Sequence, residues 1–142
     1  MNTKTLQPAE WARPKGYANG MTARGQMIFI SGQVGLDAHG QFNSDNLTEQ
    51  VKQSLRNIVR VLQEAQAQPR HLVRFTWYVL SRDAYLREVR EIGTAYREIL
   101  GKHFPAMSVV EVQKLVEQRA LVEIEVTAVI PDDEAHGHVA PT

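Results

Sequence analysis

The chain has 142 residues, and its 16 Lys and Arg residues balance 16 Asp and Glu residues, so the formal net charge is zero. It contains no cysteine, which excludes disulfides, thiolate metal sites and cysteine nucleophiles. A basic surface of the kind that binds nucleic acid is not expected, and no apolar run approaches the ~20 residues of a membrane helix. We therefore expect no nucleic-acid partner and no membrane span.

A chain of this length fits one domain and is long enough to bury a sizeable core. We expect that core within residues 17–130. Residues 1–14 form a polar arm without the apolar segment of a secretory signal, so the expected location is cytoplasmic. Residues 131–142 contain Pro, Asp, Gly and His, a composition typical of a frayed tail.

The first part of the core predicts two short strands, residues 17–23 and 27–31, joined in a hairpin at Gly25-Gln26. Residues 37–40, Asp-Ala-His-Gly, favour a turn. A helix follows, because its apolar residues recur with a 3.6-residue period. These residues are Leu47, Val51, Leu55, Ile58, Val59, Leu62 and Ala65.

Signals for the ends of this helix flank the periodic segment. Asn46 followed by Glu49 has the form of a capping box, in which two side chains would satisfy two backbone N–H groups. Pro69 marks the end of the segment, since proline cannot continue a helix.

The second half of the chain predicts four more elements, three strands and one helix. Residues 72–80 are rich in β-branched and aromatic residues and predict a strand. A helix is expected over residues 83–100, ending at Gly101. Two strands follow, residues 108–112 and 121–130, and the last alternates apolar and polar side chains.

The predicted order is ββ-α-β-α-ββ, an α+β fold with a mixed sheet. Two helices cover only one face of such a sheet. The other face is too apolar for free solvation and too polar for the core of a monomer; it carries Thr76, Tyr78, Leu121, Glu123, Glu125, Thr127 and Val129. Such a face is typical of a hydrated subunit interface, so we expect an oligomer formed through the sheet.

Two parts of the sequence resemble the signatures of the YjgF/RidA family, also called endoribonuclease L-PSP. Residues 31–40 run Ser-Gly-Gln-x-Gly-x-Asp-x-x-Gly, and Gly16-Tyr17 resembles the family's Gly-Pro-Tyr with altered order. Residues 104–112 and 121–125 are similar to the family's Pro-Ala-Arg-Ser-x-Val-Glu-Val and Val-x-Ile-Glu-Ile-Glu. The likeness spans residues 17–130 and is collinear with both predicted helices.

The resemblance implies a chorismate-mutase-like fold and a homotrimer, in which three sheets form a barrel with clefts between subunits. Active members hydrolyse enamines and imines, such as 2-aminoacrylate, to 2-oxo acids and ammonia, with no metal and no cofactor. In these members an arginine binds the substrate carboxylate and a glutamate positions water. A tyrosine, a serine and, in some members, an asparagine complete the cleft that holds the small-molecule ligand.

Carried over residue by residue, the resemblance assigns the tyrosine to Tyr17, the serine to Ser31 and the glutamate to Glu123. The position of the arginine is occupied by Met107, and that of the asparagine by Gly93. This chain therefore resembles a subgroup of the family that lacks the substrate-binding arginine.

Methionine changes what the cleft can bind. It cannot reproduce the bidentate bonds of a guanidinium to a carboxylate, each worth ~1.5–3 kcal/mol. It offers polarisable apolar surface instead, so we expect a neutral or aromatic ligand. Arg24 and Arg119, both in predicted turns, are candidates to replace the missing arginine from another direction.

Three functions stay open. The first is an imine or enamine deaminase with an altered substrate, in which Glu123 positions water; the alternative for Glu123 is a solvated place on the barrel face. The second is a non-catalytic trimer that binds a metabolite, because Met107 and Gly93 remove both polar anchors of the substrate. The third is the ribonuclease or translation-inhibitor activity of the older family name, which the balanced charge argues against.

Overall fold

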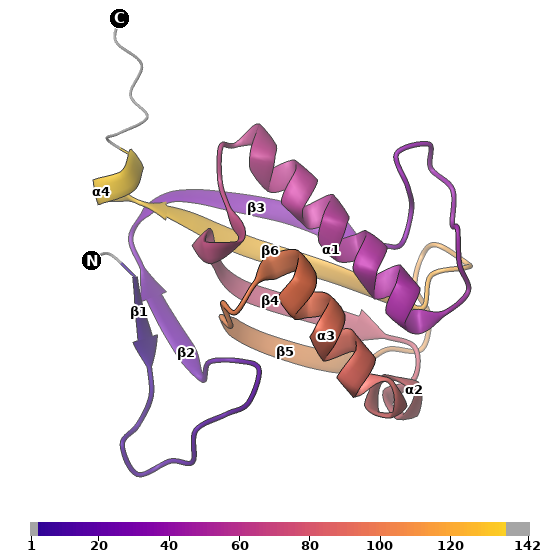
Figure 1. Cartoon of the computed structure of the whole chain (residues 1–142), viewed down its shortest axis with the longest axis horizontal. Coiled ribbons are helices and arrows are strands. Elements are labelled where there is room, and N and C mark those ends of the chain that lie inside the picture. Colours follow the sequence, from indigo (N-terminus) through magenta and orange to yellow (C-terminus); the bar gives the residue numbers. More distant parts are fainter. Residues whose placement is uncertain (1–2, 136–142) are drawn as a thin grey trace, which may run out of the picture.

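The computed structural model describes residues 3–135, and its main body is a four-stranded sheet with helices on one face (Figure 1). The strands lie in the order β3-β6-β4-β5. β4 and β5 are parallel, whereas β6 is antiparallel to both β3 and β4. The bounds are Gly25–Gln33 (β3), Leu72–Val79 (β4), Ala106–Glu111 (β5) and Val122–Pro131 (β6). The predicted α+β class with a mixed sheet is confirmed.

Two long helices, α1 (Leu47–Glu64) and α3 (Val89–Leu100), lie side by side over this sheet (Figure 1). The side chain of Asn46 accepts a hydrogen bond from the Glu49 N–H at 3.0 Å, as the predicted cap requires. The Glu49 carboxylate pairs with Lys52 at 2.9 Å instead of turning back to Asn46. None of the helices in residues 3–135 has the length and hydropathy of a bilayer span.

The core lies between the helices and the sheet. It forms where the two-residue period of the strands and the 3.6-residue period of the helices present apolar side chains to the same layer. The alternation predicted for β6 is confirmed, since its inward residues are all buried: Val122, Ile124, Val126, Ala128 and Ile130. The stripe of α1 meets them with four side chains that have no exposed surface: Val51, Leu55, Ile58 and Leu62.

The predicted hairpin between residues 17–23 and 27–31 is wrong. β2 (Gly20–Ala23) instead pairs with β1 (Thr3–Leu6), a strand within the polar arm, in a separate two-stranded sheet. The reason lies at Gly25, which has a φ of 151° and lies so close to the backbone of Ile130 that no side chain fits. This close approach joins the start of β3 to β6, and β2 is left to pair with the arm.

The sequence predicts one continuous helix over residues 83–100, but the structure has two. The segment divides at Glu88 into α2 (Arg82–Arg87) and α3, because Glu88 leaves the helical conformation with φ −103° and ψ 12°. The Glu88 carboxylate accepts hydrogen bonds from the N–H and hydroxyl of Thr48, at 3.1 and 2.6 Å. The break therefore anchors α2 and α3 to the first turn of α1.

The start of the predicted tail is ordered, contrary to the expectation of fraying. Pro131 belongs to β6, and Asp132–Ala135 form a short helix, α4. Glu134 holds this helix through Arg70 at 2.6 Å and His71 at 2.9 Å, residues of the 3-10 turn Pro69–His71. Residues 136–142 lie outside the described residues.

The sheet face opposite the helices remains open in the single chain. Because the neighbouring residues Ile28 and Ile30 of β3 pack against the core, Met27 and Phe29 lie on the open side, 56% and 71% exposed. Val129, one of the residues expected on this face, pairs with Met27 but is buried. Exposed apolar side chains of this size favour a further layer against the sheet.

Candidate functional site

Met107 and Gly93 line the same cavity, which has a volume of about 260 Å³ and lies between β5 and α3. Met107 lies opposite Phe75 in the parallel β4–β5 pair, and Phe75 is fully buried in the core. The Met107 side chain therefore points to the helix side of the sheet and not to the open face.

Aromatic rings form much of the cavity wall. Trp77 contacts Tyr85 edge to face at 6.2 Å between centroids, and Tyr96 stacks on Phe104 at 5.3 Å. Burial raises the pKa of the Tyr85 and Tyr96 hydroxyls, so both stay neutral. Among the described residues, the buried Nε1–H of Trp77 has no acceptor. Such a wall suits a ligand with a flat or branched apolar body.

The segment around Tyr17 meets the start of β5 at Ala18. The Ala18 N–H donates to the carbonyl of Pro105 at 3.0 Å, and Ala18 pairs with Ala106 in a parallel bridge. Lys15 and Gly16, just before Tyr17, line the cavity. The structure thus places Gly93 and Met107 on one cavity, whereas Tyr17 follows its lining residues in the chain and is 40% exposed.

Ser31 and Glu123 form a second group, on the open side of the sheet. The β3–β6 register shifts between Ile30 and Gln33, and Gly32 within this bulge lies against Glu123. A Cβ at residue 32 would lie 2.6 Å from the Glu123 Cδ, so only glycine leaves room for this carboxylate. Ser31 is exposed beside a hollow of about 330 Å³.

A single chain does not bring the two groups together. Glu123 of β6 pairs with Tyr78 of β4. Met107 lies on β5, on the other side of β4, and pairs with Phe75, three residues before Tyr78. Two strand spacings and three residues along the strand correspond to about 14 Å. The two side chains also point to opposite faces of the sheet. A site that contains both must take them from different subunits.

Neither arginine proposed as a replacement reaches the cavity. Arg24 pairs with Asp132 at 3.4 Å. Arg119 pairs with Asp45 at 2.8 Å and lies over the ring of Phe42. The cavity is lined instead by Arg97, which the sequence interpretation missed. The signal was its position four residues after Gly93, on the same side of α3.

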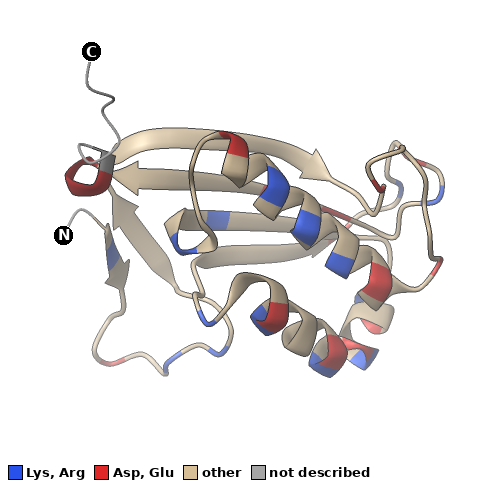
Figure 2. Ribbon diagram, turned by 45° about the horizontal axis from the view of Figure 1, so that its top comes forward, with Lys and Arg blue, Asp and Glu red and all other residues tan. Residues whose placement is uncertain are grey.

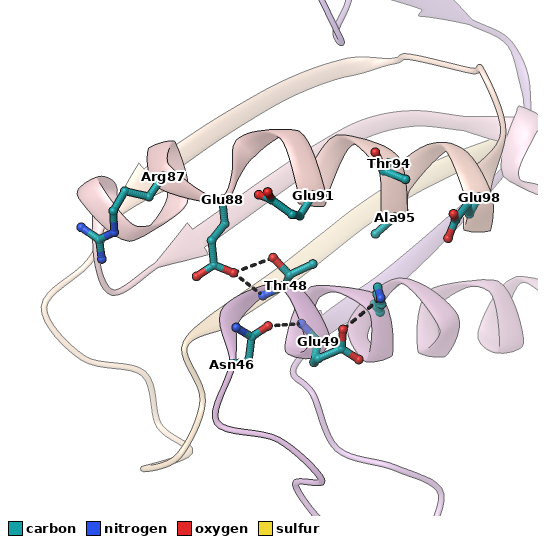
Figure 3. A pocket seen from close by; sticks show the side chains of 10 residues that line it. Asn46, Thr48, Glu49, Arg87, Glu88, Glu91, Thr94, Ala95 and Glu98 are labelled. Atoms are coloured by element: carbon teal, nitrogen blue, oxygen red, sulfur yellow. Dashed lines mark hydrogen bonds and ion pairs between the residues drawn. The ribbon is translucent and has the colours of Figure 1, made fainter.

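A wider hollow lies elsewhere, between α1 and α3, with a volume of about 560 Å³ (Figure 3). Several of its polar groups cap or join the helices, among them Asn46, Thr48 and Glu88. Glu91 and Glu98 add carboxylates along α3. No cluster of three or more His, Asp or Glu residues within residues 3–135 is placed to hold a metal ion. The hollow is an exposed groove, and its hydrogen-bonded polar groups cap or join the helices.

A mixed four-stranded sheet with two helices on one face and an open opposite face defines a YjgF/RidA-type α+β protein. The model of the family described as Endoribonuclease L-PSP matches residues 9–130, and the chain belongs to this family. The resemblance inferred from the sequence motifs is thereby confirmed.

Relatives with similar sequences and structures agree with this assignment. The RutC family protein slr0709 of Synechocystis is 33% identical over 92% of this chain and 99% of its own length. Human 2-iminobutanoate/2-iminopropanoate deaminase is 31% identical over 72% of each chain. The crystal structure of YyfB, a Rid-family protein of unknown function from Yersinia pestis, superposes with a TM-score of 0.80 at 29% identity. That alignment covers 92% of this chain and 100% of YyfB.

Proposed function

We propose that the protein binds a small metabolite at the Met107 cavity and hydrolyses it as an imine or enamine, with a substrate different from those of arginine-bearing relatives. The observation that carries this proposal is the aromatic cavity with Met107 in the place of the arginine. The name of the human relative, an iminobutanoate and iminopropanoate deaminase, supports the reaction class.

Glu123 is the proposed catalytic carboxylate. It accepts a proton from water as the water oxygen bonds to the imine carbon, while the imine nitrogen takes up a proton from solvent. Glu123 then returns its proton to the nitrogen of the carbinolamine, the C–N bond breaks, and the hydroxyl loses its proton as the carbonyl forms. The products are ammonia and the carbonyl compound. An enamine first gains a proton at carbon and becomes the imine. Ser31 and Tyr17 are proposed to bind the reacting group.

The reaction requires an assembly, because Glu123 and Met107 lie on opposite faces of one sheet. We propose the family's homotrimer, in which the open faces meet and each cleft lies between two subunits. The exposed Met27 and Phe29 support burial of this face. Replacing Phe29 by Lys is expected to give monomers in sedimentation experiments. An unchanged trimer would place the interface elsewhere.

Cleavage of RNA is the less favoured function. Along α1 a row of basic residues lies between acidic residues at both ends, and α3 carries basic and acidic residues side by side (Figure 2). A phosphate backbone is bound by clustered Lys and Arg, whose affinity falls steeply with salt. The mixed charges of these helices favour a small ligand over a polynucleotide.

The test is ammonia release from a panel of imines generated in situ by amino-acid oxidases, with Glu123→Gln beside Glu125→Gln. Both variants neutralise a carboxylate on the same face of β6, and glutamine at 125 can still accept the bond from Tyr78. We expect Glu123→Gln to lower kcat/KM about 100-fold or more, and Glu125→Gln to change it little. Ligand binding without turnover of any imine would favour the non-catalytic binding trimer.

A further inference from the structure

Gly93 and Arg97 fit together on α3. A Cβ at residue 93 would lie 3.3 Å from Nη1 of Arg97, so the guanidinium lies over the bare backbone of the glycine. Glycine is unfavourable in the interior of a helix, and nothing in the helix geometry of α3 requires it here. The presence of glycine at residue 93 is explained if the guanidinium of Arg97 occupies the space that a side chain would fill.

This guanidinium is available for a ligand. Its side-chain contact is a long hydrogen bond to the Thr94 hydroxyl at 3.4 Å, and within residues 3–135 it forms no ion pair. Lys15 is a second cation in the cavity lining, where the described residues include no Asp or Glu. Two cations without an acid, beside an aromatic wall, form an environment suited to an anion with an apolar body.

We infer that Arg97 binds the carboxylate of the ligand and that the ligand's apolar side chain occupies the cavity beside Met107. The substrate class is then a 2-imino acid with an aromatic or large branched side chain. This inference rests on the proposed function in placing the ligand in the Met107 cavity. The expected charge of the ligand changes accordingly: the carboxylate is retained, and the arginine that binds it has moved from β5 to α3.

Calorimetric titration with 3-phenylpropanoate and its neutral amide separates charge recognition from packing. The variant Arg97→Gln keeps a long polar side chain, and Arg90→Gln on the same helix, outside the cavity lining, is the matched control. Loss of Arg97 is expected to weaken the carboxylate about tenfold or more and to leave the amide unchanged. Arg90→Gln is expected to bind both probes like the wild type.

Three results would overturn the inference: no binding of 3-phenylpropanoate by the wild type, no effect of Arg97→Gln, or an equal loss for both probes. The imine assay tests the proposed hydrolysis independently of this titration. If Arg97 governs carboxylate binding but no imine is hydrolysed, the anion site stands and the hydrolase does not. If imines are hydrolysed at rates that ignore Arg97, the hydrolase stands and the Arg97 inference does not.

Discussion

Gly32 and Glu123 are matched in shape: a methyl group at residue 32 would lie 2.6 and 2.7 Å from the Cδ and Cγ of the glutamate. The clash reaches Cγ, so the whole side chain would have to turn away and not only its carboxylate. The bulge in β3 therefore fixes the direction of the proposed catalytic group.

Gly32→Ala is expected to destabilise the fold by about 1–3 kcal/mol through overpacking and to lower imine turnover about tenfold or more. Combining it with Glu123→Ala removes the clash, so the double variant should regain most of the lost stability, as measured by urea unfolding. Gly20→Ala in β2, where the three atoms nearest to a Cβ all belong to the Leu6 side chain, serves as the control. Simple additivity of the two changes would refute the contact.

Met107→Arg tests whether the arginine that the family resemblance implies at this position is the group that the cavity lacks. A guanidinium at residue 107 adds a bidentate anchor, with bonds worth ~1.5–3 kcal/mol each, so hydrolysis of 2-iminopropanoate should rise about tenfold or more. Pyruvate formation in the presence of an alanine oxidase reports the rate. Met107→Lys should gain less, because an ammonium lacks the planar fork. A folded Met107→Arg variant without gain would show that another group is missing.

The strongly periodic segments were the predictable part of the fold. α1 and β6 have long, regular apolar patterns, and the structure confirms both. The break at Glu88 was not predictable, because no Gly or Pro marks it. Its cause is a pair of hydrogen bonds to Thr48, 40 residues away in the sequence. The pairing of β1 with β2 likewise depends on the close approach of Gly25 to β6.

Only those residues of the candidate site that belong to a sequence motif were predictable. Motif spacing led to Met107 and Gly93, and the structure places both on one cavity. Arg97 was assigned to no site because charges on an amphipathic helix are usually solvated. The separation of Glu123 from Met107 follows from strand order and register, which local patterns do not determine.

Replacing each of two glycines of α3 and its C-terminal end by alanine is expected to change the stability of the fold in opposite directions. Gly93→Ala should stabilise the fold by up to about 1 kcal/mol, since alanine is the better helix former and Arg97 can shift. Gly101→Ala should destabilise it by a similar amount, because residue 101 has φ 81°. Urea unfolding measures both. Destabilisation by Gly93→Ala would show that the Arg97 head group is rigidly held.

Alkaline pH should destabilise the protein through its tyrosines. The hydrogen bond to Glu125 raises the pKa of Tyr78 above its ordinary value, and burial does the same for Tyr85 and Tyr96. The folded state thus holds these protons more tightly than the unfolded chain. The resulting stabilisation is complete below pH 10 and is lost as the pH rises toward the folded-state pKa values.

Urea midpoints measured at graded alkaline pH, together with tyrosinate absorbance, check this expectation. Tyr78→Phe should reduce the alkaline slope by removing one of the three shifted groups. A urea midpoint that does not fall above pH 10 would contradict the assignment.

Subunit mixing tests whether each site takes Glu123 from one subunit and the Met107 cavity from another. Glu123→Gln removes the proposed catalytic carboxylate, and Gly93→Leu fills the cavity from the helix side. Each variant alone is expected to be inactive. After joint unfolding and refolding in equal amounts, a functional site needs an intact contribution from each of two neighbours, which random assembly supplies in about a quarter of the sites.

We therefore expect about a quarter of the wild-type rate from this mixture. Wild type refolded in an equal mixture with Glu123→Gln should retain about half of the rate, which checks the yield of refolding. If both groups came from the same subunit, no site in the mixture of variants would be complete and its rate would stay at zero. Restored activity thus follows only from a shared site, as the strand register and the opposite directions of Met107 and Glu123 require.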